Sequence, residues 1–314
     1  SPEEPRFAVS YILFSMSKRI VIIGGGFGGL SALLGVLRRL HSRDNVEVVL
    51  VDRASYITYT PLLYEVATGA LCGNKNIREL NAGATVPFSL ANLPYHSPVT
   101  VVKATVTSVD TAKRIVTTKS GGGMHYDALI LACGSQLSTY GIPGVKEFAF
   151  GLKTLDGAQK IRRCLSKIIE DGQSGKRGAV RVVVIGGGAN GVETASEMAG
   201  ALKRAHREGC LSIPWSVLLI DQGPRFLSQM CEDASRSATR RLRRLGADLS
   251  SATTVSEVGD GWVQVMPNTK LKGHGSLFQS KKRVDADIVI WAGGVEPRPE
   301  WKRWGVELDE RGYV

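Results

Sequence analysis

The chain has 314 residues, of which 43% are hydrophobic and 22% are charged. This composition is typical of a globular protein with one large domain or two, and it excludes a collagen-like or low-complexity chain. Lysine and arginine number 40 against 29 aspartates and glutamates, and the net charge of +11 favours anionic partners or a basic surface that faces solvent.

Residues 1–15 are expected to be a leader or a non-native extension, because Met16 directly precedes the first apolar strand. The apolar stretch Phe7–Phe14 is shorter than the roughly 18 residues that a membrane-spanning helix needs. A secretory signal also fits poorly, since Glu3 and Glu4 precede the stretch and no small-residue cleavage site follows.

The first motif follows Arg19–Ile23, a β-branched run typical of a strand buried on both faces. This strand leads into three glycines with the spacing G-x-G-x-x-G, namely Gly24, Gly26 and Gly29. In such a motif the first glycine allows a tight turn, the second lets a pyrophosphate approach, and the third lets helix and strand pack closely. The next strand, Val46–Val51, ends at Asp52, whose carboxylate can accept hydrogen bonds from a ribose diol.

The same pattern recurs after Val180–Ile185, with glycines at Gly186, Gly188 and Gly191. The following strand, Ser216–Ile220, ends at Asp221. Chance alone gives about half a match per chain at this glycine content. Two matches, each between an apolar strand and a helix, therefore favour two nucleotide sites over two glycine-rich corners without a ligand. Asp221 would repel a 2′-phosphate and so favours NADH over NADPH, although Arg225 could weaken that preference.

Two dinucleotide sites in one chain imply two nucleotides. FAD and NADH are the expected pair, because hydride passes from a diffusing donor to an acceptor that the protein holds. The sequence therefore predicts an α/β protein with two Rossmann-like dinucleotide-binding domains.

Three further segments narrow the prediction to a family. Residues 126–135 (YDALILACGS) and 287–294 (DIVIWAGG) resemble the two crossovers between the FAD and NAD domains of flavoproteins of the pyridine nucleotide-disulfide oxidoreductase type, with Cys133 in place of the usual threonine. Residues 59–69 (YTPLLYEVATG) resemble the type II NADH:quinone oxidoreductases, which are single-subunit, non-pumping NADH dehydrogenases of respiratory chains. The stretches at 140–145, 191–199 and 220–227 are similar to the same family, and the resemblance covers about residues 18–314.

The resemblance implies that the NAD domain is inserted in the FAD domain. Residues 16–145 are then the first FAD-binding segment, 146–296 the NAD(H)-binding domain, and 297–314 the start of the return to the FAD domain. Because the family continues beyond the point that Val314 matches, the chain is expected to be a fragment of a longer protein.

The implied activity is hydride transfer from NADH to FAD, followed by transfer of two electrons to a membrane quinone. The implied location is a membrane surface, reached through a C-terminal region beyond these residues. That surface would be the cytoplasmic face, or the mitochondrial inner membrane in a eukaryote. A homodimer is a further expectation, and neither a metal nor a nucleic-acid partner is expected.

The resemblance also implies which residues contact each cofactor. FAD would be held by residues of the first domain: Gly24, Gly26, Phe27, Gly28, Gly29, Asp52, Arg53, Thr60, Pro61, Leu62, Val106, Ala132 and Gly134. NADH would be held by residues of the second domain: Gly186, Gly188, Gly191, Asp221, Ala292, Gly293 and Gly294. Glu193, the catalytic candidate, would shape the nicotinamide site or assist proton traffic, or would only stabilise the dipole of its helix. The alternative for Thr60 and Pro61 is that they form only a turn.

Other relatives of the superfamily remain as alternatives. A sulfide:quinone oxidoreductase needs a pair of cysteines at the flavin, for which Cys133 or Cys164 could be recruited. Disulfide reductases carry a close cysteine pair that this chain lacks, since the only thiol near the first motif is Cys72. Another NAD(P)H-flavin reductase shares the dinucleotide motifs but not usually the segment at 59–69.

A basic flavoprotein resembling apoptosis-inducing factor would bind nucleic acid through positive surface. The densest basic stretch is a predicted helix face with Arg236, Arg240, Arg241, Arg243 and Arg244, while Leu242 and Leu245 pack inward. A second basic cluster, Lys281–Arg283, is predicted to lie in a turn. Because no aromatic residues interleave with either cluster, anionic lipid or solvent is favoured over nucleic acid.

Overall fold

The computed structural model describes residues 18–41, 44–69, 71, 81–87, 99–271 and 275–313. The expected leader at 1–15 and Cys72 lie outside these residues. The chain divides into two units: unit 1 comprises Ser1–Ile57, Pro87–Gly134 and Arg298–Val314, and unit 2 comprises Thr58–Val86 and Ser135–Pro297. Because unit 1 is built from three separate stretches of chain, unit 2 is inserted in it as two stretches, whereas the sequence predicted a single inserted stretch at 146–296.

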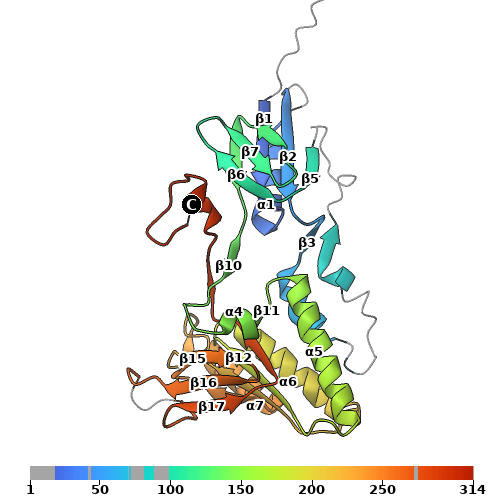
Figure 1. The fold of residues 1–314 in the computed structure, drawn as a ribbon, viewed down its shortest axis with the longest axis vertical. Coiled ribbons are helices and arrows are strands. Elements are labelled where there is room, and N and C mark those ends of the chain that lie inside the picture. The colour runs from blue at the N-terminus through green and yellow to red at the C-terminus, as the bar shows by residue number, and fades with distance from the viewer. Residues whose placement is uncertain are drawn as a thin grey trace, which may run out of the picture. The chain divides into compact units, whose positions relative to one another are not determined.

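Unit 1 contains a parallel sheet with the strand order β5-β2-β1-β9 (Figure 1). These strands are β1 (Lys18–Ile23), β2 (Val46–Asp52), β5 (Val99–Lys103) and β9 (Ala128–Leu131). The sequence predicted β1 and β2 to within one residue at each end. Successive side chains of a strand point to opposite faces, so the unbroken apolar runs of β1 and β2 bury both faces of the sheet.

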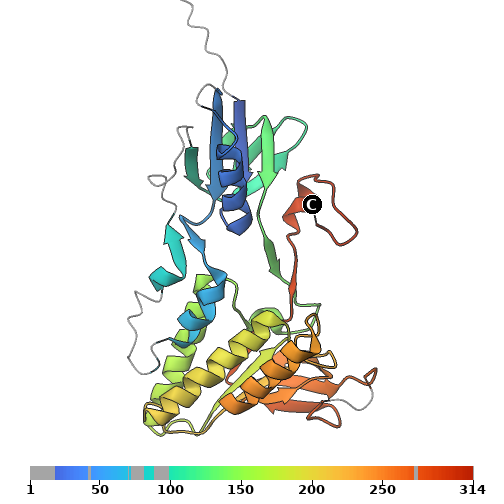
Figure 2. The same ribbon diagram turned by 180° about the vertical axis from the view of Figure 1, so that it is seen from behind.

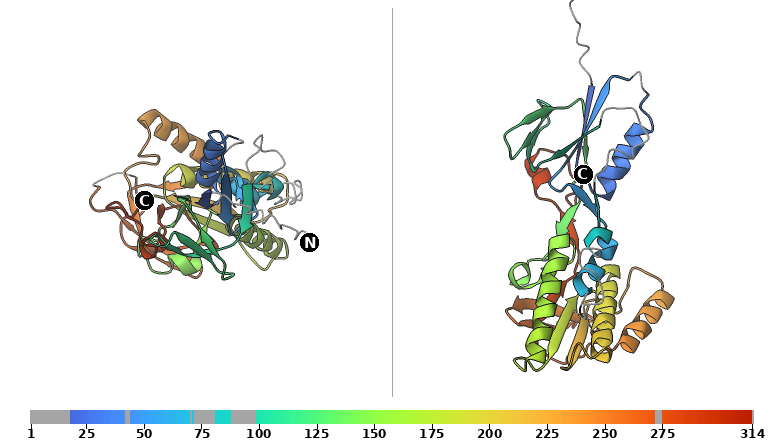
Figure 3. Two further views of the ribbon diagram at one scale, coloured as in Figure 1. Left: turned by 90° about the horizontal axis from the view of Figure 1, so that it is seen from above. Right: turned by 90° about the vertical axis from the view of Figure 1, so that its right-hand side faces the viewer.

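Different elements cover the two faces of this sheet, as the right-hand view of Figure 3 shows. Helix α1 (Phe27–Leu37) packs Leu33 and Leu37 on Ile22, Val48 and Leu50. An antiparallel meander of β6 (Val106–Asp110), β7 (Ile115–Thr118) and β8 (Gly123–His125) covers the other face together with the short helix α8 (Glu300–Arg303).

Unit 2 contains a parallel sheet with the order β11-β18-β12-β13-β14. Its strands are β11 (Phe150–Gly151), β12 (Val180–Ile185), β13 (Trp215–Ile220), β14 (Asp248–Ser250) and β18 (Ile288–Trp291). Helices α5 (Leu155–Gln173), α6 (Ala189–Arg207) and α7 (Glu232–Leu245) lie on one face, which Figure 2 shows in front.

The other face of this sheet carries an antiparallel meander and the short helix α4 (Val145–Phe148). The meander consists of β15 (Thr253–Gly259), β16 (Trp262–Pro267) and β17 (Lys282–Asp285). The turn predicted at Lys281–Arg283 is wrong, because Lys282 and Arg283 begin β17. The guanidinium of Arg283 lies 3.8 Å from the ring centre of Trp262, and this cation–π contact stabilises the strand pair.

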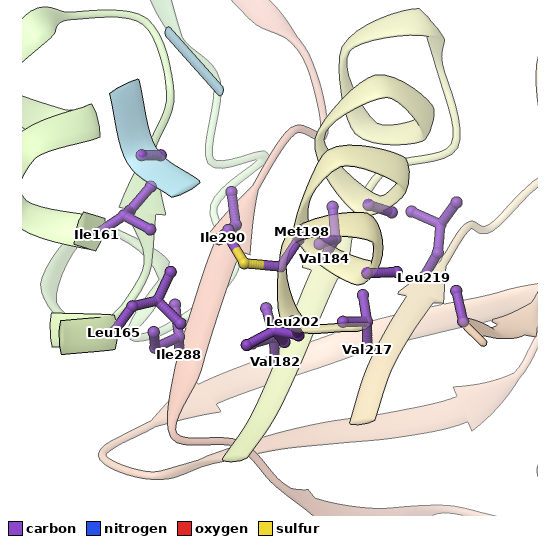
Figure 4. Packing of buried hydrophobic residues seen from close by; sticks show 14 of the residues in the cluster. Ile161, Leu165, Val182, Val184, Met198, Leu202, Val217, Leu219, Ile288 and Ile290 are labelled. Atoms are coloured by element: carbon purple, nitrogen blue, oxygen red, sulfur yellow. The ribbon is translucent and has the colours of Figure 1, made fainter. Parts of the chain in front are cut away.

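The helix-facing core of unit 2 is a continuous apolar cluster (Figure 4). Val182, Val184 and Ile290 point from the sheet toward Met198 and Leu202 of α6. The same cluster includes Leu63, Val66 and Ala67 of α2 (Leu63–Thr68), which follows the 3-10 turn η1 (Thr60–Leu62). The segment at 59–69 therefore packs on the second sheet's helices, chiefly α5 and α6.

Two pairs of short strands carry the chain between the units. In the first pair, β3 (Tyr56–Thr58) lies beside β4 (Thr85–Pro87). In the second, β10 (Ser135–Leu137) pairs antiparallel with β19 (Val295–Pro297). The crossovers predicted at 126–135 and 287–294 thus lead into a shared two-stranded ribbon.

Candidate dinucleotide-binding sites

The first glycine-rich turn joins β1 to α1. Gly24 has a φ of 103°, and a Cβ at this position would overlap the carbonyl oxygen of Ala132. A Cβ at Gly29 would overlap the carbonyl oxygen of Gly24, so α1 can start this close to the strand only because Gly29 lacks a side chain. These two glycines are therefore required by the fold itself.

The second turn joins β12 to α6 with the same geometry. Gly186 has a φ of 114°, and a Cβ there would overlap the carbonyl oxygen of Ala292. A Cβ at Gly191 would overlap the carbonyl oxygen of Gly186. Ala132 and Ala292 occupy equivalent positions, since their N–H groups donate to Ile23 and Ile185, the last residues of β1 and β12, at 2.8 and 2.7 Å.

The middle glycine of each motif behaves differently. Gly26 and Gly188 are the N-cap residues of α1 and α6, with φ values of −77° and −72° that any residue adopts. Nothing lies within 4 Å of a Cβ built at either position, and both residues are exposed. The fold alone does not require glycine here. A ligand that approaches the helix N-terminus does, because a side chain would stand in its path.

The two aspartates connect each turn to the end of the neighbouring strand. Asp52 accepts hydrogen bonds from the N–H groups of Gly25 at 2.6 Å and Ala54 at 2.7 Å. Asp221 accepts them in the same way from Gly187 at 2.6 Å and Gly223 at 2.7 Å. Each carboxylate oxygen has a further lone pair, so both aspartates can also accept from a ribose diol.

Each unit also has an aspartate at the opposite end of its central strand, and the sequence analysis did not identify this pair. Asp127 precedes β9 and accepts a hydrogen bond from the backbone N–H of Arg19 at 2.7 Å. Asp287 precedes β18 and accepts one from Arg181 at 2.7 Å. The signal was present, because an aspartate lies five positions before Ala132 and before Ala292 in the two crossover segments.

Most other predicted FAD contacts lie around the first turn. Phe27 and Gly28 are exposed beside Gly26, with Phe27 51% exposed, and Arg53 is exposed directly after Asp52. The N–H of Ala104 donates to the Asp52 carbonyl at 2.8 Å, which brings the start of β6, where Val106 lies, to the same strand end. Gly134, with a φ of 67°, follows Ala132 at the end of β9.

The remaining predicted FAD contacts, Thr60, Pro61 and Leu62, form η1 and belong to unit 2. Thr60 and Pro61 are exposed, while Leu62 packs on the helix-side core. Arg162 of α5 is buried beneath α2 and donates to the Val66 carbonyl oxygen at 3.5 Å. Burial lowers the pKa of this guanidinium. The 59–69 segment is thus anchored on the second domain, which the sequence did not predict.

Glu193 lies exposed on α6, four residues beyond its first residue, and its charge acts on the same segment. The pKa of Tyr64 on α2 is raised by burial and then by the negative charge of Glu193, with smaller contributions from Glu65 and Glu197. Glu197 also accepts a hydrogen bond from the Thr68 hydroxyl at 3.3 Å. The catalytic candidate is therefore part of an acidic group around a tyrosine that sequence reasoning did not single out.

The predicted NADH contacts Ala292, Gly293 and Gly294 follow β18, immediately beside the turn at Gly186. The sequence suggested that Arg225 could weaken the preference for NADH over NADPH, but its side chain bonds to its own loop. Its guanidinium donates to the carbonyl oxygens of Leu227, Ser228 and Met230 at 3.0, 3.1 and 2.8 Å. Arg225 is therefore tied to the 227–230 loop, and Asp221 is the charged side chain at the end of β13.

A family profile described as pyridine nucleotide-disulphide oxidoreductase matches residues 18–314. The chain belongs to this family. The assignment agrees with the two sheets, their glycine turns and the inserted second unit described above.

Within the pyridine nucleotide-disulphide oxidoreductase family, the chain is similar to proteins named as NADH dehydrogenases. It is 30% identical over 312 residues to type II NADH:quinone oxidoreductase Ndh of Mycobacterium tuberculosis, covering 94% of this chain and 62% of that protein. It is 29% identical over 307 residues to the external alternative NAD(P)H-ubiquinone oxidoreductase B1 of Solanum tuberosum mitochondria, covering 91% of this chain and 49% of that protein. These relatives confirm the resemblance to type II enzymes, and the chain spans about half to three fifths of their length.

Solved structures show the same fold. NDH2 from Plasmodium falciparum, solved in complex with NADH, has a TM-score of 0.74 at 21% identity, covering 94% of this chain and 59% of that one. The sulfide:quinone oxidoreductase of Aquifex aeolicus has a TM-score of 0.71 at 19% identity, covering 95% and 63% of the two chains. The architecture of two Rossmann-like domains, one inserted in the other, is thereby confirmed.

Proposed function

We propose that this chain carries the FAD and NADH sites of an NADH:quinone oxidoreductase. The observation that carries the proposal is the repeated turn, in which two glycines are required by the fold and the middle one is left open toward the helix N-terminus. The names of the mycobacterial and potato relatives support the choice of reaction. In the net reaction, NADH, a proton and a quinone give NAD⁺ and a quinol.

The first turn, at Gly24–Gly29, holds the FAD diphosphate with the N–H groups at the start of α1, and Asp52 binds the adjoining ribose. Phe27, Gly28, Arg53, Val106 and Gly134 line the same strand ends, within the proposed FAD segment at 16–145. When bound, FAD supplies an acceptor for hydride and a donor of two electrons to the quinone. The residues of the chain contribute binding, orientation and exclusion of water.

The second turn, at Gly186–Gly191, holds the NADH diphosphate, within the proposed NAD(H) domain at 146–296. Asp221 accepts hydrogen bonds from the ribose diol and repels a 2′-phosphate, which makes NADH the preferred donor. Because Arg225 is bonded to three carbonyl oxygens of its own loop, it does not offset this repulsion.

Glu193 shapes the nicotinamide end of this site. It lies four residues beyond Ala189, the first residue of α6, and its charge acts on Tyr64. Thr60, Pro61 and Leu62 lead into the helix that carries Tyr64, which supports their assignment to the region where nicotinamide and flavin meet. A Glu193→Gln enzyme that keeps its FAD should turn over more slowly than wild type.

The sulfide:quinone oxidoreductase alternative is less well supported. Burial raises the pKa values of the Cys133 and Cys164 thiols, which keeps them protonated and weakly nucleophilic. Cys133 also donates a weak hydrogen bond to the Ile23 carbonyl oxygen at 3.7 Å, within the core of unit 1.

The quinone acceptor places the reaction at a membrane surface, either the cytoplasmic face or the mitochondrial inner membrane. Across the part of the chain that the structure describes, no helix is long and apolar enough to span a bilayer. The basic face of α7 suits peripheral attachment to anionic lipid. Leu242 is fully buried and Leu245 packs on the core, as predicted. The apolar side of α7 therefore faces the protein, and the arginines lie on its outer face.

Arg236 on this helix is neutralised by Glu232 and Asp233 at 2.9 and 2.5 Å. The next four arginines have no carboxylate partner among the described residues, and we name them the α7 arginines: Arg240, Arg241, Arg243 and Arg244. Such a surface attracts anionic lipid with about 1 kcal/mol per residue.

A homodimer, which the family resemblance allows, is tested by light scattering.

The proposed function is tested by the visible absorbance of the purified protein, mixed with NADH without oxygen. Flavin bands that bleach with NADH, and much less with NADPH, are expected. Addition of a quinone should then restore the bands and produce quinol. A protein that neither contains nor takes up FAD would refute the proposal.

A further inference from the structure

Tyr140 combines three features that the proposed function does not use. Its φ of 49° lies in the left-handed region that tyrosine rarely adopts. Its side chain is 65% exposed. Its hydroxyl oxygen lies against Gly294, where a Cβ would be only 2.5 Å away. The contact therefore exists because residue 140 accepts a strained backbone and residue 294 is a glycine.

The fold holds this contact in place. The indole N–H of Trp291 donates to the Ser138 carbonyl oxygen at 2.6 Å, and the Ser138 N–H donates to the Gly294 carbonyl oxygen at 3.2 Å. Trp291 is 4% exposed, so the first of these bonds is buried. The turn at 138–140 is thus attached to the end of β18 through both backbone groups of Ser138, two residues before the strained residue, and strain that is maintained in this way often marks a functional position.

Strand order locates Tyr140 relative to the NADH site. The sheet runs β18-β12-β13, with the glycine turn after β12 in the middle. Asp221 ends β13 on one side, and Gly294 follows β18 on the other side. A dinucleotide that crosses the turn with its adenosine ribose at Asp221 extends its other half toward β18. That half would meet Gly294 and the ring of Tyr140.

We propose that Tyr140 is a positioning residue for the nicotinamide half of NADH. The inference rests on the proposed function, because it assumes that NADH occupies the second turn. An exposed aromatic ring fixed by a short, strained turn offers a rigid apolar wall. Packing of the nicotinamide riboside against this wall removes water from one side and restricts the ring to orientations that allow hydride transfer.

The test uses the FAD-loaded enzyme with Tyr140→Gly and Tyr140→Phe. Glycine relieves the left-handed backbone strain but gives the unfolded chain more freedom, so the two effects offset and Tyr140→Gly should unfold at close to the wild-type denaturant concentration. The rate constant of anaerobic flavin bleaching at saturating NADH should fall about tenfold. Affinity for ADP-ribose, which lacks the nicotinamide, should stay within about twofold of wild type. Tyr140→Phe keeps the ring and should restore the bleaching rate.

The outcomes separate this inference from the proposed function. Tyr313, which is 36% exposed in unit 1, supplies the control Tyr313→Phe, with unchanged bleaching expected. If wild type binds NADH and Tyr140→Gly bleaches at the wild-type rate, the role of Tyr140 is overturned while the function stands. An equal loss of ADP-ribose affinity would also overturn it. If wild type does not bind NADH, the proposed function itself fails.

Discussion

Replacing Gly188 by alanine should weaken NADH binding and leave stability nearly unchanged. The backbone at Gly188 has φ −72° and ψ −177°, which alanine adopts without strain, and no atom lies within 4 Å of the new methyl group. Glycine-to-alanine changes at unstrained positions stabilise proteins by about 0.4–1 kcal/mol, because the unfolded chain loses conformational freedom. Gly188 is the N-cap of α6, where alanine is less favourable than glycine by a similar amount, so the free energy of unfolding should stay within about 0.5 kcal/mol of wild type.

The binding loss follows from the position of the methyl group at the start of α6. A phosphate oxygen accepts hydrogen bonds from N–H groups at this N-terminus, and each bond to a charged acceptor contributes about 1.5–3 kcal/mol. Displacement of the diphosphate by one methyl group should cost about one such bond, which corresponds to about a ten- to hundredfold rise in the NADH dissociation constant. Titration calorimetry of the FAD-loaded enzyme measures the constant, and urea unfolding without NADH measures the stability.

Gly191→Ala is the matched control, because the same added methyl group would overlap the Gly186 carbonyl oxygen and force α6 away from β12. This variant should lose about 1–3 kcal/mol of stability. The reasoning is refuted if Gly188→Ala is destabilised as much as Gly191→Ala, or if it binds NADH as tightly as wild type. Gly26→Ala and Gly29→Ala should repeat the contrast at the first site, with FAD retention as the readout.

Three further predictions concern charges. Asp221→Asn should reduce the preference for NADH over NADPH without loss of FAD, whereas Asp52→Asn should loosen FAD and leave that preference unchanged; the opposite pattern would reverse the two site assignments. The pKa of Tyr64 is raised in the folded protein, so its contribution to stability is present below the pKa of an unfolded tyrosine and is lost as pH rises through the folded value. Glu193→Gln should lower the phenolate titration midpoint that disappears in Tyr64→Phe, and an unmoved midpoint would contradict the contact. Reversing two α7 arginines, R240E/R241E, should weaken binding to phosphatidylglycerol vesicles at least about tenfold; the same reversal of the two lysines at 281–282 should do less, and equal losses would exclude a specific α7 face.

Much of the geometry of the two glycine turns could be predicted from the sequence because its determinants are local. A β-branched strand, a glycine spacing and an aspartate at the end of the next strand are contiguous patterns, and the backbone geometry that they require is the geometry observed at Gly24 and Gly186. The strand ends were correct for the same reason, since Val180–Ile185 matches β12 at both ends. The sequence did not separate the middle glycine from its neighbours, because the difference lies in what surrounds each Cα in space.

The features that the sequence did not reveal depend on contacts between distant segments. The contact of Tyr140 with Gly294 joins two crossovers more than half the second unit apart in sequence. The acidic group around Tyr64 combines α2 with α6, and neither helix alone predicts it. Arg225 illustrates the same limit, because its three hydrogen bonds to carbonyl oxygens of its own loop are not visible in the sequence around Asp221.

Helix α2 is attached to the helices of unit 2 rather than to the strands that precede it in sequence. In sequence α2 follows the FAD-side strand that ends at Asp52, yet its apolar side belongs to the core formed by α5 and α6. Arg162 reinforces this attachment, because a buried guanidinium is stable only while the Val66 carbonyl and its other acceptors remain in place. The 3-10 turn at Thr60–Leu62 is therefore held by the NADH-side unit. A change at Arg162 should therefore loosen α2 and the 3-10 turn without touching either glycine turn.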